Sequence, residues 1–182
     1  IDVVVLTHLH FDHCGGATRL DREGNIVPTF PKARYLVQRK AWDEACNPNE
    51  RALPAYSHGC SELDVIKERG QLDLLDGDVD LAPGVKATVA HGHADGHQIV
   101  TVNAGSERLV FLADLVPTSH HLPLPYITAY DRYPDQTLQA KKEVLARAER
   151  EGWLMIFYHG LVDRAGYIER RGASVSLKAV AV

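Results

Sequence analysis

The stretch Thr7-His8-Leu9-His10-Phe11-Asp12-His13-Cys14-Gly15-Gly16 decides how the rest of this chain is interpreted. Side chains alternate along an extended backbone, so His8 and His10 point the same way, and Asp12 and His13 follow where the backbone turns. Neutral imidazoles and carboxylates are ligands that zinc and similar divalent ions accept. The pattern therefore predicts a metal site that distant residues complete, against the alternative of a histidine-rich loop that hydrogen-bonds to itself.

The segments on either side of this stretch predict how it is held. The apolar run Val3-Val4-Val5-Leu6 predicts a buried strand that ends at the histidines. Gly15 and Gly16 allow a tight turn, which we expect to lead into a short helix at 17–20. Glycine and proline punctuate the polar segment 21–31, which predicts a loop insert.

Short strands and a few helices are predicted along the rest of the chain. The predicted strands are 33–38, 72–75, 79–82, 85–89, 98–103, 109–113 and 153–158, with a closing hairpin of 167–171 and 174–182. The predicted helices are 39–46, 61–69 and 136–151, with Asp135 as the cap of the last. Because turn residues separate the strands between 72 and 89, these strands predict a meander.

Three separate strands each end at a residue of metal-ligand type. Leu6 comes shortly before His8, the strand 109–113 comes directly before Asp114, and the strand 153–158 comes directly before His159. Ends of neighbouring strands converge in space, so residues far apart in the sequence can meet at one edge of a sheet. We therefore expect these residues to belong to one metal centre.

These motifs resemble those of a known family. His8-Leu9-His10-Phe11-Asp12-His13 resembles the H-x-H-x-D-H signature of the metallo-β-lactamase superfamily, and Gly92–His97 resembles its G-H-x-x-G-H stretch, whose final histidine is a ligand. Asp114, in the sequence Ala-Asp-Leu, resembles the bridging aspartate, and His159 resembles the last ligand. The resemblance implies an α+β fold, an αββα sandwich, with residues 1–182 as a single hydrolase domain.

The resemblance also implies a centre with two divalent ions, and zinc is the expected metal. It assigns the ligands as His8, His10 and His97 on one ion, Asp12, His13 and His159 on the other, and Asp114 between both. A hydroxide that bridges the two ions would then hydrolyse the substrate. Asp12 and Asp114 are the predicted catalytic residues, Asp12 because it could orient the hydroxide or carry its proton to the leaving group. His93 is interpreted as a supporting residue rather than a ligand.

The loop 115–134 resembles that of the superfamily branch with quorum-quenching lactonases and organophosphate hydrolases. Many lactonases of that branch have a tyrosine three residues after the bridging aspartate, where this chain has Pro117. Tyr126 and Tyr130 are predicted to bind substrate in its place, with packing inside the loop as the alternative. The Leu- and Pro-rich loop favours a small ester or lactone. A glyoxalase II-like thioesterase is the alternative, weakened because a basic cluster for glutathione carboxylates is not evident.

Composition sets the class of protein. The 182 residues are 45% hydrophobic and 24% charged, which suits one globular domain with a substantial core. The net charge of −4 and the scattered lysines and arginines argue against nucleic acid, and the apolar runs are too short for a membrane span. Cys14, Cys46 and Cys60 are too few for a disulfide framework, so a reducing, cytoplasmic compartment is expected. Cys14 is interpreted as a small buried filler, with a redox role as the alternative.

The chain opens at Ile1 with the strand that leads to the site, whereas the family has a sheet segment before that strand. The fold is therefore expected to be N-terminally incomplete, with an exposed edge and apolar face that a partner covers. A homo-oligomer is one such arrangement. A non-catalytic metal-binding or interaction module is a further alternative function. Three further side chains are expected either to lie near the metals or to pack inside the protein: Trp42, Tyr56 and His58.

Overall fold

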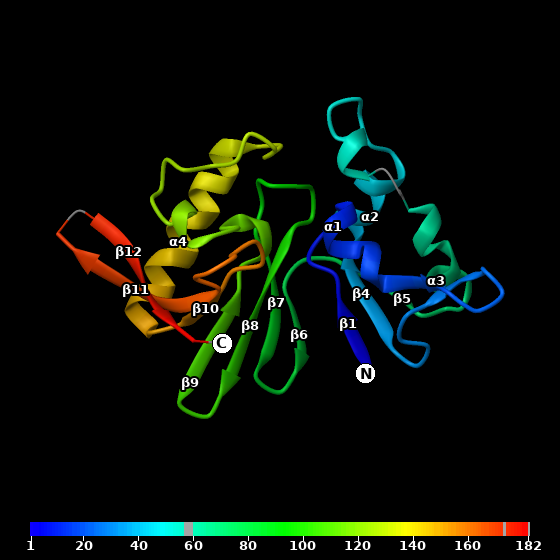
Figure 1. Cartoon of the computed structure of the whole chain (residues 1–182), viewed down its shortest axis with the longest axis horizontal. Coiled ribbons are helices and arrows are strands. Elements are labelled where there is room, and N and C mark those ends of the chain that lie inside the picture. Colours follow the sequence, from blue (N-terminus) through cyan, green and yellow to red (C-terminus); the bar gives the residue numbers. More distant parts are fainter. Residues whose placement is uncertain (57–59, 173, 182) are drawn as a thin grey trace. The chain divides into compact units, whose positions relative to one another are not determined.

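The computed structural model describes residues 1–56, 60–172 and 174–181. Residues 1–77 form one compact unit, here called the first unit, and residues 78–182 form the second unit (Figure 1). The prediction for His58 and the last residue of the predicted closing hairpin, Val182, lie outside the described residues.

A parallel three-stranded sheet organises the first unit. It consists of β1 (Val3–Val5), β4 (Arg34–Gln38) and β5 (Leu72–Leu75), in the order β1-β4-β5. Its helical elements are α2 (Arg39–Cys46), η2 (Leu53–Tyr56), η3 (Ser61–Leu63) and α3 (Asp64–Glu68). Tyr35 and Val37 of the central strand are fully buried against Ala41 and Trp42 of α2 and Ile66 of α3. This core fixes the end of β1, from which the histidine stretch begins.

The prediction of a helix at 17–20 is wrong, and the predicted loop at 21–31 is interrupted by a short strand at 26–28. The helix comes earlier, as α1 (Phe11–Cys14) followed by η1 (Gly15–Ala17), and the next residues form the hairpin β2 (Thr18–Leu20) and β3 (Ile26–Pro28). Asp21 closes this hairpin, because its Oδ1 accepts hydrogen bonds from the backbone N–H groups of Glu23 and Asn25 at 3.0 and 2.8 Å. This local side-chain turn outweighs the turn signals of glycine and proline.

A seven-stranded sheet in the order β12-β11-β10-β9-β8-β7-β6 forms the second unit. The strands are β6 (Val79–Ala82), β7 (Val85–Val89), β8 (Gln98–Ala104), β9 (Glu107–Phe111), β10 (Leu154–Ile156), β11 (Ala165–Arg171) and β12 (Ser174–Val180). Neighbouring strands are antiparallel except β9 and β10, which run parallel. The mixture of helices with mostly antiparallel sheet confirms the α+β class.

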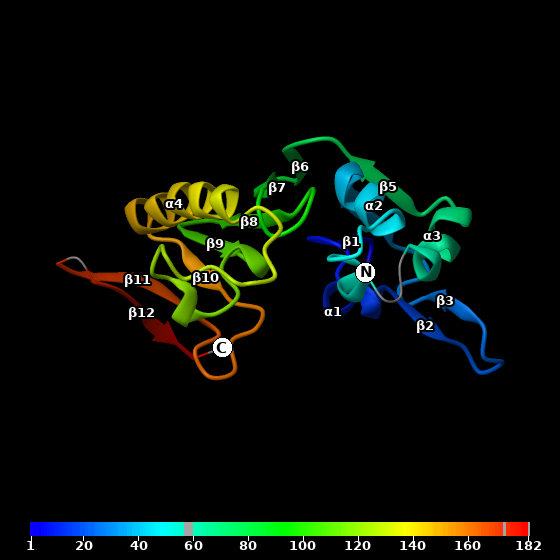
Figure 2. The ribbon, with the colours of Figure 1, turned by 90° about the horizontal axis from the view of Figure 1, so that it is seen from above.

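The long helix α4 (Pro134–Glu151) covers one face of this sheet (Figure 2). Leu145 and Ala148 of α4 pack into a core with Val110, Leu112 and Met155, all three of which are fully buried. The helix begins at a proline, which suits the first helical position because its missing N–H would have no partner there. The predicted cap, Asp135, therefore lies inside the first turn, and Tyr133 is the N-cap residue.

The predicted meander at 72–89 is partly wrong. β6, β7, β8 and β9 do pair in sequence as antiparallel neighbours, but β5 pairs in parallel with β4 in the other sheet. The helical segment between β4 and β5 is long enough for the crossover that parallel strands need. β9 also ends two residues earlier than predicted, because a 3-10 turn begins at Ala113.

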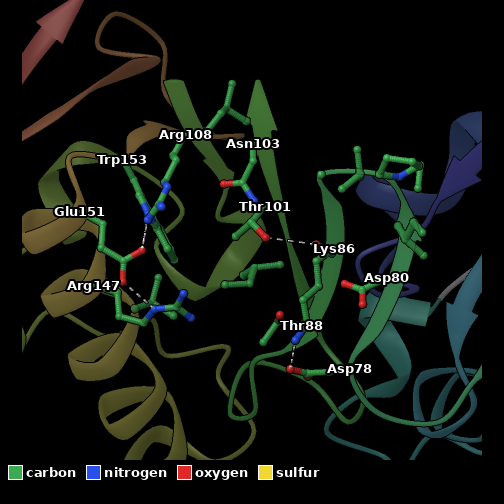
Figure 3. A pocket seen from close by; sticks show the side chains of 18 residues that line it. Asp78, Asp80, Lys86, Thr88, Thr101, Asn103, Arg108, Arg147, Glu151 and Trp153 are labelled. Carbon is green, nitrogen blue, oxygen red and sulfur yellow. Dashed lines mark hydrogen bonds and ion pairs between the residues drawn. The ribbon is translucent and has the colours of Figure 1, made fainter. Parts of the chain in front are cut away.

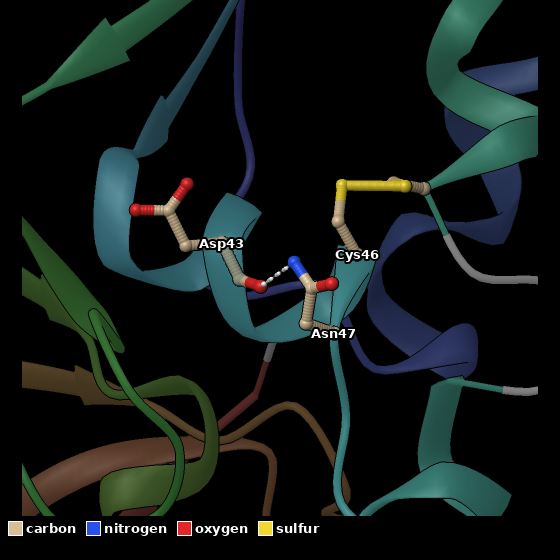
Figure 4. Close-up of a disulfide and its surroundings, with 4 residues drawn as sticks. Asp43, Cys46 and Asn47 are labelled. Atoms are coloured by element: carbon tan, nitrogen blue, oxygen red, sulfur yellow. Dashed lines mark hydrogen bonds between the residues drawn. A yellow bond between two sulfur atoms is a disulfide. The ribbon is translucent and has the colours of Figure 1, made fainter.

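The cysteines differ from the prediction in one respect. Cys46 at the end of α2 and Cys60 form a disulfide (Figure 4). Cys14 is a free, buried thiol that donates to the Leu9 carbonyl oxygen at 3.4 Å, and burial raises the pKa of this thiol to about 11. The interpretation of Cys14 as a buried filler is therefore favoured over a redox role.

None of the helices in the described part of the chain is both long enough and apolar enough to cross a lipid bilayer.

Candidate metal centre

In the first unit, three predicted ligands from the opening stretch form a tight cluster. The ring centroid of His8 lies 4.5 Å from that of His10 and 4.2 Å from that of His13. His8 is fully buried, and its Nδ1 lies 3.2 Å from the Thr7 hydroxyl. Rings this close together can direct nitrogen atoms at one shared ion.

The short helix α1 creates this cluster. The His10 carbonyl accepts hydrogen bonds from the backbone N–H groups of His13 and Cys14 at 2.9 and 3.0 Å, so the chain turns back directly after His10. The turn returns His13 to the side of His8, and it places Asp12 Oδ2 3.4 Å from His13 Nε2. Asp12 is exposed, which leaves its carboxylate accessible to a proton acceptor or donor outside the cluster.

In the second unit, two hydrogen bonds fix the tautomer of His97. Its Nδ1 lies 3.1 Å from the Ala90 carbonyl oxygen, and the backbone N–H of Asp114 points at its Nε2 at 3.2 Å. Since a carbonyl only accepts and an amide N–H only donates, Nδ1 carries the proton and Nε2 carries the lone pair. A histidine ligand fixed through its second nitrogen in this way is typical of metal sites.

Asp114 and His159 meet because their strands are neighbours. β9 and β10 pair in parallel, with Phe111 opposite Ile156, so both strands end at the same edge of the sheet. His159 Nε2 lies 3.2 Å from Asp114 Oδ1, and the backbone N–H of His159 donates to the Pro117 carbonyl at 3.0 Å. The structure thus brings together the three ligands predicted in the second unit.

The backbone directly before Asp114 is strained. Ala113 has a φ of 44°, the left-handed region that side chains other than glycine rarely adopt. The residue is fully buried at the start of the 3-10 turn Ala113–Leu115. Left-handed non-glycine residues gather at functional sites, where the surrounding packing holds them in place. Here the strained residue turns the chain so that Asp114 meets His97 and His159.

His93 lies between two carboxylates. Its Nδ1 is 3.0 Å from Asp131 Oδ1, and its Nε2 is 3.3 Å from Asp114 Oδ2. Burial raises the pKa of Asp131, but the hydrogen bonds from His93, Thr128 and Thr137 outweigh burial and hold this pKa below its usual value. An ionised, buried Asp131 can therefore orient His93, and through it Asp114. These contacts are compatible with a supporting role for His93, which stays a prediction.

Asp131 is a site residue that the sequence reasoning missed. It belongs to the segment Asp131-Arg132-Tyr133, directly before α4, and is 3% exposed. A carboxylate within three residues of the proline that starts a helix is a weak signal, because such residues usually cap helices on the surface. Its partner His93 lies 38 residues away in the sequence. Only the folded chain reveals the pair.

Gly92 allows the His93 segment to approach the start of α4. It has a φ of 129°, and a Cβ added there would lie 2.2 Å from both the backbone nitrogen and the Oγ1 of Thr137. The Gly92 carbonyl also accepts a hydrogen bond from the Tyr133 N–H at 2.8 Å. No side chain fits in this contact, so glycine is required both by the backbone and by the space.

The predicted substrate-binding residues lie on the surface. Tyr126 is 59% exposed and Tyr130 is 84% exposed, both in the long loop between η5 (Ser119–His121) and α4. Packing inside the loop, the alternative for these tyrosines, is therefore not favoured.

A hollow of about 850 Å³ also occurs in the second unit, between α4 and the sheet (Figure 3). The predicted metal ligands are not among its described lining residues. Several of its charged groups are paired: Arg108 with Glu151 at 2.6 Å, and Lys86 with Asp78 at 3.3 Å. This hollow is therefore not the candidate site.

Each of the two clusters, taken by itself, has the ligand types of a divalent metal centre. Their side chains are imidazoles and carboxylates, which suit zinc and related ions. Within the second unit, the tautomer of His97 tests whether these residues suit a metal ion: Nε2 carries no proton, as a metal ligand requires. The residues present are thus compatible with bound metal.

Comparison with known proteins identifies the relatives of this chain. The family model described as the metallo-beta-lactamase superfamily matches residues 1–159. The N-acyl homoserine lactonase AiiA of Bacillus thuringiensis subsp. kurstaki is 26% identical over 161 residues, which cover 87% of this chain and 55% of that protein. The chain thus spans about half the length of the curated relatives it matches.

Solved structures show the same fold. A protein described as a probable metal-dependent hydrolase from Staphylococcus aureus superposes with a TM-score of 0.80 at 28% identity, over 100% of this chain and 64% of that protein. AidC, a dizinc quorum-quenching lactonase in complex with a product, has a TM-score of 0.80 at 20% identity, over 100% of this chain and 65% of its own. At that identity the second likeness concerns the fold alone.

Proposed function

The chain belongs to the metallo-beta-lactamase superfamily, and on that premise we propose that it is a metal-dependent hydrolase that cleaves a small ester or lactone. The contacts of Asp114 carry this proposal: it faces His93 and His159 through its carboxylate and His97 through its backbone N–H. Imidazoles gathered around a carboxylate are the ligand types that suit zinc and related ions.

We propose that the residues of the two clusters hold two divalent ions, and that the metal is zinc. The ligands would be His8, His10 and His97 on one ion, Asp12, His13 and His159 on the other, with Asp114 between both. Bound there, the ions would lower the pKa of a shared water to near neutrality and so supply the hydroxide that attacks the carbonyl carbon.

The chain's own residues would supply positioning and proton transfer. Asp12 is the exposed carboxylate of its cluster, so it is suited to orient the attacking oxygen and to deliver a proton to the leaving alkoxide as the ester C–O bond breaks. Asp131 and His93 would keep the Asp114 carboxylate in its orientation. Tyr126 and Tyr130 would contact the substrate from the exposed loop.

The lactone preference rests on the relatives. The curated relatives described above are N-acyl homoserine lactonases, and a lactone is a cyclic ester that the same attack opens. Pro117, at the position where many such lactonases have tyrosine, makes Tyr126 or Tyr130 the residue proposed to supply a hydroxyl. The thioesterase alternative involves the same attack on a thioester carbonyl, and the choice of substrate separates the two.

Metal content and hydrolysis of the full chain test the proposal together. Zinc-loaded protein should bind close to two ions per chain and hydrolyse p-nitrophenyl butyrate or N-hexanoyl homoserine lactone. Asp12→Ala and His97→Ala should each lower kcat/KM by a factor of about 100 or more, since removal of a catalytic acid–base alone removes about 10²–10⁴. His91→Ala is the matched control, because His91 is exposed and close in sequence to His97.

Other outcomes would point elsewhere. Hydrolysis of a glutathione thioester but of neither ester nor lactone would replace the proposal with the thioesterase alternative. Metal binding without turnover of any of these substrates would indicate a non-catalytic metal-binding module.

A further inference from the structure

Lys141 is a buried lysine in the middle of α4. It is 1% exposed, whereas the next residue, Lys142, is exposed. Its Nζ donates hydrogen bonds to the carbonyl oxygens of Pro123 and Tyr126, both at 2.8 Å. Both acceptors belong to the loop before α4, which runs beside this helix (Figures 1 and 2). One side chain thus connects the helix to two points of the loop.

A lysine in this position needs a reason. Fully buried lysines are rare unless they are paired, because burial of the charge is costly. Burial lowers the pKa of Lys141 to about 8, and the negative charge of Asp131 opposes this shift only in part. An apolar residue at this position would pack against the loop without that cost. The two carbonyl contacts are what a methionine or leucine could not make.

The loop that Lys141 contacts is fixed at both ends and exposed between them. Leu122, at its beginning, is buried in the core of the second unit, and Asp131, at its end, is buried against His93. Between these anchors, Leu124, Tyr126 and Tyr130 are 37%, 59% and 84% exposed. The segment therefore presents apolar and aromatic side chains to solvent, on a backbone that the two Lys141 hydrogen bonds support.

We infer that Lys141 is a positioning residue that determines substrate specificity: its two hydrogen bonds hold the backbone of 123–126 so that the exposed loop offers a preformed contact surface for the apolar acyl part of the substrate. This inference rests on the proposed hydrolase function and extends it to the residue that fixes the substrate loop. Ordering the loop before binding would lower the entropic cost of substrate binding. Lys141 would then act on KM for long acyl chains more than on kcat.

The backbone N–H of Tyr126 reports on this arrangement without any need for activity. It donates to the Pro123 carbonyl at 3.0 Å, the same oxygen that accepts from Lys141. In the Lys141→Met variant, which keeps the length and loses the donors, hydrogen exchange of peptides covering 122–130 should become about tenfold faster, corresponding to ~1.4 kcal/mol of lost local protection. Lys142→Met, the same substitution at the exposed neighbour, should leave this exchange unchanged.

Kinetics with two esters test the specificity. For Lys141→Met we expect KM for p-nitrophenyl hexanoate to rise about tenfold, the same ~1.4 kcal/mol, whereas kcat/KM for p-nitrophenyl acetate stays within about twofold. Lys142→Met should resemble wild type with both esters. Circular dichroism and thermal unfolding confirm that each variant is folded. Should Lys141→Met not fold, Lys141→Leu, which also lacks a donor, takes its place in the same measurements.

The outcomes separate this inference from the proposed function. Unchanged exchange at 122–130 in the folded variant would overturn the positioning role. An equal loss with both esters would overturn the specificity role and leave a purely structural lysine. If wild type hydrolyses neither ester, the proposed function fails, and the specificity role of Lys141 fails with it. Faster hydrogen exchange in Lys141→Met would still show that Lys141 stabilises the loop.

Discussion

The Nδ1 atom of His93 and the Oδ1 atom of Asp131 lie 3.0 Å apart, both on side chains that are almost completely buried. On the other side of the ring, His93 Nε2 lies 3.3 Å from the Asp114 carboxylate. A buried carboxylate, a histidine and a proposed metal ligand therefore form one line of contacts. Residues that orient metal ligands in this way affect metal affinity or activity strongly when they are changed.

Asp131→Asn tests this line of contacts. The amide keeps the size of the side chain but not its charge, so the hydrogen bond that orients His93 is weakened and, with it, the support of Asp114. We expect metal affinity or kcat/KM to fall by a factor of about 10–100, measured by metal competition with a chromogenic chelator and by ester hydrolysis. Asp135→Asn, at an exposed position nearby in sequence, should change neither. Wild-type metal affinity and activity in Asp131→Asn would refute the positioning role of Asp131.

Gly92→Ala should be strongly destabilising. The added methyl group would overlap the backbone and hydroxyl of Thr137, and the backbone has a left-handed φ as well. We expect the free energy of unfolding to fall by about 2 kcal/mol or more in denaturant titrations. Gly105→Ala is the matched control, because Gly105 also has a left-handed φ but open space around it. An equal loss in both variants would mean that the close contact with Thr137 contributes nothing.

Lys141 should make stability depend on pH above pH 8. Burial lowers its pKa to about 8 in the folded protein, against the usual value of 10.5. Between these values the unfolded chain binds more protons than the folded one, so the contribution of Lys141 to the free energy of unfolding rises with pH, from about pH 8 to about pH 10.5. Denaturant titrations of wild type and Lys141→Met across this range should show the difference between them shift in favour of wild type as pH increases. A constant difference would contradict the lowered pKa.

The disulfide between Cys46 and Cys60 should be visible in solution. A thiol assay under denaturing conditions should titrate one thiol per oxidised chain, that of Cys14, and three after reduction. The bridged cysteines are 14 residues apart in sequence, so the loop-entropy estimate for the Cys46→Ser/Cys60→Ser double variant is a loss of about 3 kcal/mol in the free energy of unfolding. Three titratable thiols without a reductant would show that the bridge does not form.

The sequence predicts well those features that depend on neighbouring residues. The strand before the histidines, the helix 39–46 and most strands of the second unit follow from local hydrophobic patterns, and the structure confirms them. The strand before the histidines is only partly buried, however, with Val3 exposed, because it lies at the edge of its sheet. The proximity of Asp114 and His159 also follows, because each comes three residues after the end of a strand and the two strands are parallel neighbours. The signal in each case is carried by a few consecutive residues.

Features that depend on distant pairing could not be predicted. The parallel pairing of β4 with β5, the Cys46–Cys60 bridge and the contact of Asp131 with His93 each join segments that the sequence pattern treats as independent. Lys141 is a further case. On a helix whose neighbouring positions are mostly charged, it looks like any surface lysine, and only the two loop carbonyls 18 and 15 residues away distinguish it.

Ala113 combines a strained backbone with a fixed orientation of the next residue, Asp114. Glycine would adopt the φ of 44° with less strain, yet glycine would also let the peptide before Asp114 visit many other conformations. The methyl group of alanine restricts these conformations. The Asp114 carboxylate is therefore oriented by the backbone as well as by the residues that contact it. An Ala113→Gly protein would thus have less backbone strain, but the carboxylate of Asp114 would be held less firmly in its orientation.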